Sequence, residues 1–379
     1  MAHRVLLVGG GTGGHVYPLV AVARALKDEA AKTGVSLELL MMGDGPVFER
    51  AARENGIRYA TIIAPKLRRY ASIGNVLDVF KVPFALLQSF IRLLFFMPDA
   101  VFAKGGYTCV FPVLAARFYF IPVYLHESDS IPGLANRMLA RRSTLVFTAF
   151  ASADQAFGAL GRPTALVGNP FRAHLCTTDR VAAHTALKLD PAKKTMLIIG
   201  GSLGAVQLND LVLEGLVRLV QKGYQVIHQT GEKNFAEVKK AVEQYMAEGA
   251  TTYAPLIAAQ YRVYPFLDES ELAAAYGAAD IAVTRASASV LTELACARKP
   301  MIVVPLPGSA NDHQQANAAE LAKYGAVVMD GANVSVQVLM AQVERMLEPT
   351  TYADLSNRIA AFAKPDAAAA IARVLLARP

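Results

Sequence analysis

Cysteine is scarce in this sequence, and its few thiols have no spacing that suits a metal ion. Cys109, Cys176 and Cys296 stand far apart and are odd in number. Neither a disulfide framework nor a zinc site is indicated, and a reducing cytoplasm fits this usage best. A signal peptide is not expected either, because an apolar run at residues 5–8 and a glycine loop follow Met1 almost directly.

The sequence has few charged residues and lacks the motifs of nucleic-acid-binding and metal-dependent proteins. Charged residues make up 18% of the chain and hydrophobic residues 54%, and 379 residues suit two folded domains. The net charge is +7, with local clusters at Lys66, Arg68, Arg69, Arg137, Arg141 and Arg142. No nucleic-acid-binding motif accompanies them, so we expect phosphorylated substrates or anionic lipid as partners and no nucleic acid. No Asp-x-Asp pair occurs, so no metal is expected.

Apolar runs divide the chain into two similar α/β halves. Short buried-strand patterns alternate with helix-length stretches, first at residues 5–8, 37–42, 100–103, 123–125 and 144–148, and again at residues 195–199, 225–228, 280–284 and 301–304. Each half opens with a strand and a glycine loop. The two loops match at their leading glycines, Gly10 and Gly200, at a hydroxyl residue and at the closing glycine. Two Rossmann-like domains are therefore predicted, with a ligand between them.

The glycine loops are candidate phosphate sites. Glycines directly after a strand allow a sharp turn and let backbone N–H groups approach a phosphate at the start of a helix. A ligand-free turn is the alternative. The first loop also matches the dinucleotide fingerprint at Gly9, Gly11 and Gly14, but the acidic residue wanted at the end of the second strand, Asp44, comes late. His15 stands directly behind the loop, where an imidazole suits proton transfer better than it suits a pyrophosphate.

Several segments resemble the motifs of glycosyltransferase family 28, and the resemblance covers nearly the whole chain. GGTGGHVYP at residues 10–18 resembles the family's N-terminal signature, and GNPFR at residues 168–172 its linker. Further matches are Lys104, Gly105, Gly106, Tyr107, His126, Glu127, GGSLGA at residues 200–205, Thr292, Glu293, His313, Gln314, Gln315 and Asn317. The chain departs from the family pattern at Ser128, Asp129 and Leu203.

This resemblance implies a GT-B fold, in which two Rossmann-like domains face each other across a cleft. Residues 1–168 would form the acceptor-side and membrane-facing domain, residues 169–351 would bind the donor, and a C-terminal helix at about 352–379 would pack back on the first domain. The implied reaction is an inverting, metal-independent transfer of N-acetylglucosamine from UDP-N-acetylglucosamine to undecaprenyl-diphospho-muramyl-pentapeptide in peptidoglycan synthesis. UDP-N-acetylglucosamine is then a substrate, and no cofactor is expected.

The resemblance also implies where the donor binds. Ser202 and the amides of Leu203 and Gly204 would hold the α-phosphate. Glu293, on the turn after a strand, would accept both ribose hydroxyls, and Leu267 would contact uracil through its backbone. The other residues that resemble donor contacts are Thr12, Gly13, Gly14, Asp129, Arg172, Ser289, Val290, Leu291, Thr292, Gln314 and Gln315.

The acceptor diphosphate is expected in the first half, at the loops that contain Gly11, Thr12, Gly13, Gly14, Gly105, Gly106 and Tyr107. His15 is the candidate general base. An ordinary imidazole pKa of about 6.5 leaves it largely neutral, and such proton transfer typically accelerates a reaction by about 10²–10⁴-fold. Phosphate binding or helix capping is the alternative role for His15. His126 and Glu127 are the alternative bases.

An apolar stretch at residues 76–97 bears on the location of the protein. Asp78, Lys81 and Arg92 interrupt it, and Pro83 breaks it. A spanning helix needs about 20 predominantly apolar residues, and each central charge costs roughly 3 kcal/mol. We therefore expect no span but a peripheral contact with the anionic inner leaflet of the cell membrane, with burial in the core as the alternative.

Three other functions fit part of the pattern. A related family 28 enzyme would use another lipid acceptor. A nucleotide-sugar-binding module would need no base at His15, and a UDP-sugar epimerase would need further acid and base residues. Formation of a disaccharide-lipid from UDP-N-acetylglucosamine and a lipid-linked muramyl acceptor separates them.

Overall fold

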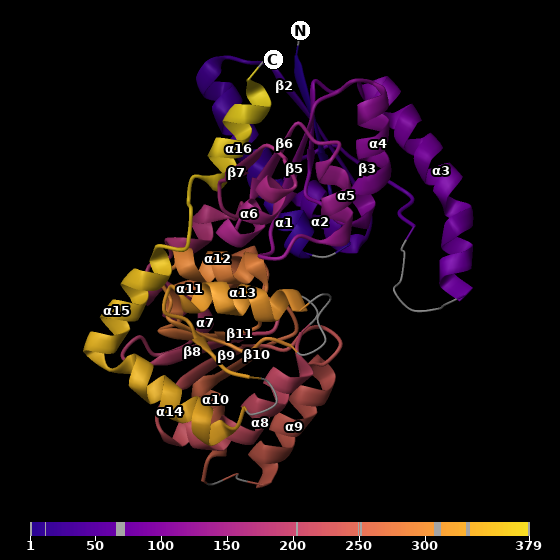
Figure 1. The fold of residues 1–379 in the computed structure, drawn as a ribbon. Helices are drawn as coiled ribbons and strands as arrows, with labels where there is room; N and C mark the ends of the chain where they lie inside the picture. Colours follow the sequence, from indigo (N-terminus) through magenta and orange to yellow (C-terminus); the bar gives the residue numbers. More distant parts are fainter. Residues whose placement is uncertain are drawn as a thin grey trace. The chain divides into compact units, whose positions relative to one another are not determined.

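The computed structural model describes residues 2–11, 13–65, 73–201, 204–248, 250, 252–306, 312–330 and 334–377, and only the backbone of residues 73–77. The chain forms two compact units, Met1–Phe171 with Lys364–Pro379, and Arg172–Ala363. Each unit is an α/β domain built on a parallel sheet, as predicted (Figure 1). Some residues discussed above lie outside the described part, namely Thr12, Lys66, Arg68, Arg69, Ser202 and Leu203.

In the first unit, seven parallel strands of the described chain lie in the order β3-β2-β1-β4-β5-β6-β7. The strands are β1 (His3–Val8), β2 (Leu37–Gly43), β3 (Tyr59–Thr61), β4 (Ala100–Ala103), β5 (Val123–Glu127), β6 (Leu145–Thr148) and β7 (Thr164–Leu166). The helices are α1 (Gly13–Thr33), α2 (Pro46–Glu54), α3 (Ile73–Phe96), η1 (Tyr107–Cys109), α4 (Val110–Phe118), α5 (Leu134–Ala140), α6 (Ala151–Ala159) and α16 (Ala367–Leu376).

In the second unit, six parallel strands of the described chain lie in the order β10-β9-β8-β11-β12-β13. They are β8 (Thr195–Ile199), β9 (Gln225–Gln229), β10 (Tyr261–Tyr264), β11 (Ile281–Thr284), β12 (Met301–Val303) and β13 (Val327–Val328). The helices are η2 (Ala173–Cys176), α7 (Arg180–Leu187), α8 (Val206–Gln221), α9 (Phe235–Glu248), α10 (Ala254–Gln260), α11 (Glu269–Ala278), α12 (Ala288–Cys296), α13 (His313–Ala322), α14 (Val336–Leu347) and α15 (Pro349–Ala360).

The central strands form because their residues are apolar on both faces. All residues of β4, β8 and β11 are buried, which a parallel sheet covered by helices on both sides requires. Each unit accordingly has one hydrophobic cluster on either face of its sheet. Every strand expected from the apolar runs is present. The strands that carried no such run are β3, β7, β10 and β13, which are the edges of the two sheets.

The C-terminal segment forms two helices, where one helix at about 352–379 was expected. α15 belongs to the second unit and α16 to the first, and the chain passes between the units near Lys364. Pro365 explains the break, because proline disfavours a helical conformation of the residue before it and donates no backbone hydrogen bond. α16 packs on α1, and the ring of His3 donates a hydrogen bond to the Leu375 carbonyl at 2.9 Å.

The other boundary falls between Phe171 and Arg172, three residues beyond the expected position after residue 168. The strand order fixes where a ligand site is expected in each unit. Chain direction across the sheet reverses between β1 and β4 in the first unit and between β8 and β11 in the second. In open α/β sheets, ligands bind beyond the carboxyl ends of the strands at such a reversal. The glycine loops follow β1, β4 and β8, so they lie at these two points.

Candidate active site

The two glycine loops of the first unit touch each other where the sheet order reverses. Gly11 has a φ of +88°, and a Cβ added to it would lie 3.2 Å from the Tyr107 hydroxyl. Tyr107 donates a hydrogen bond to Asp44 at 3.2 Å. The second loop is fixed by a hydrogen bond from the Gly106 amide to the Asn136 side chain of α5 at 3.3 Å. A Cβ on Gly105 would lie 2.3 Å from that same side chain, so only glycine fits there.

The structure brings His15 to this pair of loops. His15 lies in the first turn of α1 with Gly13 and Gly14, and its Nε2 is 3.6 Å from the position of a Cβ on Gly106. Burial and then the charge of Lys104 lower the pKa of His15 to about 4, against the opposing charge of Asp129. The imidazole is therefore neutral at physiological pH and can accept a proton. An anionic ligand beside it would raise its pKa toward the range that suits a general base.

His126 and Glu127, the alternative bases, have structural roles. His126 is 0% exposed, and its Nε2–H donates to the Gly168 carbonyl at 3.0 Å while Nδ1 accepts from Lys104 at 3.0 Å. Neither nitrogen is free to take a proton from a substrate. The buried Glu127 carboxylate accepts from the amides of Asp129 and Gly133, each at 3.0 Å, and from Asn136 at 2.9 Å. It holds the loop after β5, and His15 stays the predicted base.

The donor-side loop of the second unit lies where β8 and β11 adjoin. Gly204 has a φ of +72°, and a Cβ there would lie 2.0 Å from the Thr230 carbonyl, so the position requires glycine. The Arg285 guanidinium donates to the Gly204 carbonyl at 2.8 Å and to the Gly200 carbonyl at 3.3 Å. A partly buried cation therefore lies against the carbonyls of this loop, and burial lowers the pKa of Arg285.

Leu267 and the donor-side loop are joined by a residue that the sequence did not single out. Gln229, the last residue of β9, donates to the Gly201 carbonyl at 3.0 Å and accepts from the Leu267 amide at 3.1 Å. The Leu267 amide is thus already used, and its side chain is 2% exposed. Gln314 lies on α13 and accepts from the Leu306 amide at 3.1 Å, whereas the neighbouring Gln315 is exposed.

Glu293 lies within a helix and not on a turn, which corrects the sequence-based expectation. It belongs to α12 together with Ser289, Val290, Leu291 and Thr292, and it is 3% exposed. Its Oε1 accepts from Nε and Nη2 of Arg172 at 3.2 and 3.1 Å, and its Oε2 accepts from the Tyr276 hydroxyl at 2.8 Å. Two lone pairs per oxygen leave Oε2 able to accept one more donor, so the expected ribose contact stays a prediction.

The structure adds three polar residues to those found from sequence, namely Asn136, Gln229 and Arg285, and it gives a place in the site to Lys104, which the sequence matched only as part of the second glycine loop. Gln229 ends a parallel strand, and Lys104 and Arg285 directly follow the strand ends at Ala103 and Thr284. A search for polar residues at the carboxyl ends of predicted strands would have found these three. Asn136 lies on α5 and carries no such signal. Within the described ranges, no group of three or more His, Cys, Asp or Glu side chains could hold a metal ion.

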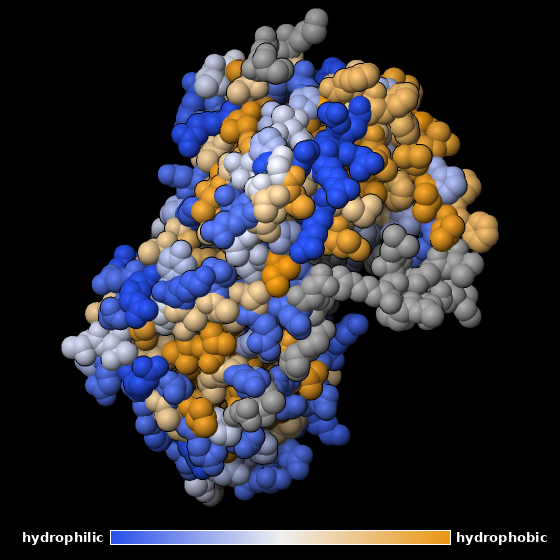
Figure 2. Space-filling model, in the orientation of Figure 1, coloured by the Kyte–Doolittle hydropathy of each residue, from blue (hydrophilic) through white to orange (hydrophobic). Residues whose placement is uncertain are grey.

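α3 presents an apolar face to solvent. Phe80 is 69% exposed, Phe84 63% and Phe95 83%, and Phe118 and Phe120 at the end of α4 are exposed as well. Figure 2 shows hydrophobic residues gathered over α3 and α4. Among the described residues, one segment, Asp78–Phe96 of α3, is long and apolar enough to cross a membrane by length and composition alone. The other face of α3 is anchored through Phe90, whose ring packs against Phe118.

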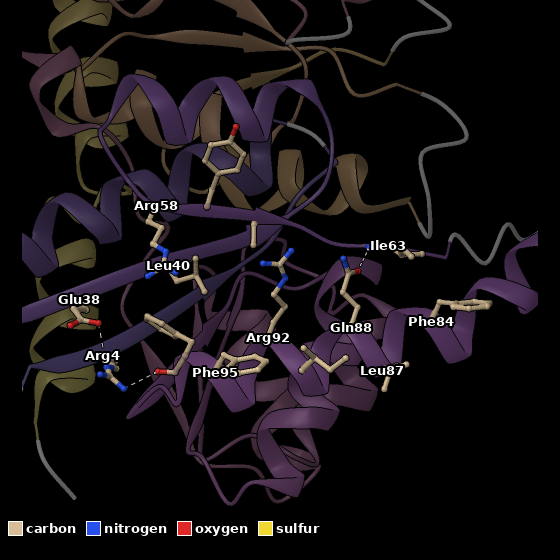
Figure 3. A pocket seen from close by; sticks show the side chains of 14 residues that line it. Arg4, Glu38, Leu40, Arg58, Ile63, Phe84, Leu87, Gln88, Arg92 and Phe95 are labelled. Atoms are coloured by element: carbon tan, nitrogen blue, oxygen red, sulfur yellow. Dashed lines mark hydrogen bonds and ion pairs between the residues drawn. The ribbon is translucent and has the colours of Figure 1, made fainter.

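A groove of about 810 Å³ runs between α3 and the strands β1 to β3 (Figure 3). Apolar side chains of α3 line it together with three arginines, Arg92 from α3 and Arg4 and Arg58 from the strand side. Arg4 pairs with Glu38 at 3.3 Å, whereas Arg58 and Arg92 have no carboxylate partner among the described residues. Arg92 reaches from α3 toward the strands, between Arg58 and Gln88 (Figure 3). The described part of the chain thus carries positive charge beside the exposed apolar face.

Comparison with known proteins identifies the family. The model of the glycosyltransferase family 28 N-terminal domain matches residues 5–148, and that of the C-terminal domain matches residues 195–371. A protein of Treponema denticola, 35% identical over 89% of this chain and 86% of its own length, is named a UDP-N-acetylglucosamine–N-acetylmuramyl-(pentapeptide) pyrophosphoryl-undecaprenol N-acetylglucosamine transferase. A protein of Phocaeicola vulgatus with the same name is 33% identical over 98% of this chain and 95% of its own length.

Solved structures agree with this assignment. MurG of Acinetobacter baumannii superposes with a TM-score of 0.70 at 25% identity, covering 99% of both chains. A UDP-N-acetylglucosamine 2-epimerase of Neisseria meningitidis reaches a TM-score of 0.68 over 98% of this chain and 99% of its own, but at 14% identity it shows only a shared fold. With both of its domains matched by the family models and with full-length relatives above 30% identity, this glycosyltransferase belongs to family 28.

Proposed function

We propose that this enzyme transfers N-acetylglucosamine from UDP-N-acetylglucosamine to a lipid-linked muramyl-pentapeptide in peptidoglycan synthesis. The names of its full-length relatives support both substrates. The observation that carries the proposal is the position of His15, a neutral imidazole on two touching glycine loops at the point where the sheet order reverses. A nucleotide-sugar-binding module would need no base there.

The reaction is an inverting displacement at the anomeric carbon. An acceptor hydroxyl forms the new C1–O bond, its proton passes to His15 Nε2, and the bond between C1 and the phosphate oxygen breaks to release UDP. The buried Asp44 Oδ1, which has no hydrogen-bond partner among the described residues, lies beside these loops and can accept from a ligand hydroxyl or from a protonated phosphate. The glycine amides and the start of α1 favour the acceptor diphosphate.

The leaving UDP is stabilised without a metal ion. The start of α8 provides backbone N–H donors, and the Arg285 cation binds the Gly200 and Gly204 carbonyls of the loop that precedes this helix. Arg172 and Glu293, which form a buried ion pair at 3.1 Å, lie on the side of the site that receives the ribose of UDP. A fixed arginine in a partly buried position can stabilise developing phosphate charge because it needs no reorganisation during the reaction.

The enzyme docks on the anionic cytoplasmic face of the cell membrane as a peripheral protein. The exposed phenylalanines of α3 and the arginines of the neighbouring groove support this placement, since apolar insertion and attraction to anionic lipid reinforce each other. A lipid-linked acceptor is available only at such a surface.

The test is an assay of the purified enzyme with UDP-N-acetylglucosamine, with and without the lipid-linked muramyl acceptor. We expect UDP release and a disaccharide-lipid in equal amounts, and only with the acceptor present. Epimerised UDP-sugar without acceptor would support the epimerase instead. Binding of the UDP-sugar with no product under either condition would support a binding module. His15→Gln should abolish turnover while it leaves UDP affinity unchanged, and Gln315→Ala, at an exposed position on α13, tests the expected contact with the sugar.

A further inference from the structure

Lys104 is buried at the crevice between β1 and β4, and its ammonium forms no ion pair with a carboxylate of the described residues. The side chain is 1% exposed, and its backbone amide donates to the Val8 carbonyl of the neighbouring strand at 2.8 Å. Within the part of the chain that the structure describes, its one hydrogen bond through Nζ goes to His126 Nδ1 at 3.0 Å. Since the Nε2–H of His126 donates to Gly168, Nδ1 is the acceptor and the ring is neutral. Two of the three ammonium hydrogens therefore have no acceptor among the described residues.

A buried ammonium without an ion pair is costly, and folded proteins avoid it unless a ligand or function requires it. The carboxylates of Glu127 and Asp129 act on Lys104 only through space. The Cβ of Lys104 is 3.2 Å from the position of a Cβ on Gly9, so the side chain starts directly under the first glycine loop. Its charge also reaches His15, whose pKa it helps to lower. The side chain thus starts beside the first loop, directly precedes the second loop in the chain, and carries a charge that acts on the base.

We propose that Lys104 is the electrostatic positioning residue of the acceptor site, and that its charge holds the diphosphate of the lipid-linked acceptor on the two glycine loops. This inference rests on the proposed function, because it assigns a counterion to that acceptor. The backbone amides of the loops provide the direct hydrogen bonds. Lys104 contributes a full charge beneath them in a medium that screens it far less than water does.

The inference predicts a pH dependence that only lysine can produce. Burial lowers the pKa of Lys104 to about 8, against the raising effect of Glu127 and Asp129. Diphosphate affinity should therefore fall as the pH rises from about 7 to 9.5, with the midpoint moved above 8 by the bound anion. The titratable groups that face Lys104 are His15 on α1, Cys109 on η1, His126 and Glu127 on β5, and Asp129 in the loop after β5. His15 and His126 titrate in acid, and burial raises the pKa of Cys109 to about 12.

The experiment measures calorimetric binding of geranyl diphosphate, a soluble isoprenoid diphosphate, to the full-length enzyme at pH 7. Lys104→Met and Lys104→Gln remove the charge, and Gln can still donate toward His126. Both should raise the Kd for geranyl diphosphate by roughly 10- to 100-fold, the contribution typical of a charged partner. Lys104→Arg should retain most of the affinity and lose its dependence on pH, since arginine stays charged. Lys299→Met is the matched control, because burial also lowers the pKa of Lys299 to about 8, but in the second unit.

The outcomes separate this inference from the proposed function. Weak binding of geranyl diphosphate to Lys104→Met and Lys104→Gln, with an unchanged Kd for UDP, supports the inference, provided that thermal unfolding shows both variants folded. Equal affinity of the wild type and both neutral variants overturns the role of Lys104 and leaves the proposed function standing. No binding of geranyl diphosphate to the wild type, while UDP still binds, overturns the acceptor assignment and this inference together. If Lys104→Arg loses affinity as much as Lys104→Met does, the side chain acts through packing and the inference fails.

Discussion

Replacing Glu293 by alanine should damage both donor binding and folding, because the structure places its carboxylate in a buried network. The substitution removes the carboxylate that lies 3.1 Å from the Arg172 guanidinium, which is 6% exposed and 3.6 Å from Glu269, and it leaves the buried Tyr276 hydroxyl without its acceptor. Removing one partner of a buried ion pair typically costs about 3–5 kcal/mol. For a unit of this size, such a loss lowers the melting temperature by about 6–20 °C. The same change should raise the Kd for UDP by roughly 10- to 100-fold, because a carboxylate that accepts from ribose is lost.

Calorimetric titration with UDP and thermal unfolding measure the two effects separately. Asp280→Ala provides the matched control, because Asp280 is also a buried carboxylate of the second unit, paired with Arg180 at 3.1 Å and Lys194 at 3.2 Å. It should lower the melting temperature as well and leave UDP affinity unchanged below the transition. An unchanged UDP Kd in Glu293→Ala would falsify the ribose contact. Equal losses of UDP affinity in both variants would show that the effect comes from folding, and an unchanged melting temperature would refute the estimate for the buried pair.

Three further outcomes are expected. Folding lowers the pKa of His15 from 6.5 to about 4, so the neutral ring contributes its full stabilisation above pH 6.5 and loses it as the pH falls toward 4. Between pH 6.5 and 4, the melting temperature of His15→Gln should therefore fall less than that of the wild type. Turnover should persist in EDTA, and loss of turnover that Mg²⁺ restores would contradict the stabilisation of UDP by backbone amides and Arg285. Replacing Phe80, Phe84 and Phe95 together by serine should weaken sedimentation with anionic vesicles by at least about 100-fold, since each phenylalanine contributes about 1.5–3 kcal/mol when fully buried. Unchanged vesicle binding would place the membrane contact elsewhere.

The apolar runs predicted the centre of each sheet because central parallel strands are buried on both faces. Residues 100–103 and 195–199 are continuous apolar segments, and they became β4 and β8. Edge strands need no continuous apolar run, because one of their long edges faces solvent and pairing with a single neighbouring strand is enough to form them. Tyr59–Thr61 and Val327–Val328 are short and partly exposed, and they are strands only because β2 and β12 lie beside them.

Sequence alone also predicted where the glycine loops lie, since strand, glycines and helix follow one another in the chain. The same local order led to His15 as the predicted base and to the donor-side loop as the predicted phosphate site. It could not distinguish a catalytic carboxylate from a structural one. Glu127 and His126 stand next to each other in a motif, but their partners, Asn136 and Gly168, come from distant parts of the first unit.

The sequence therefore determined the features that depend on residues close together in the chain. These are the two α/β halves, the loops after their strands and the family to which the chain belongs. The tertiary structure decided which charges and hydrogen-bond partners surround the polar residues at those loops. Burial and hydrogen bonding occupy His126 and Glu127, leave Lys104 without an ion-pair partner among the described residues, and lower the pKa of His15. These properties depend on charges and dipoles that folding brings within a few ångströms of each other, and no spacing in the sequence records those distances.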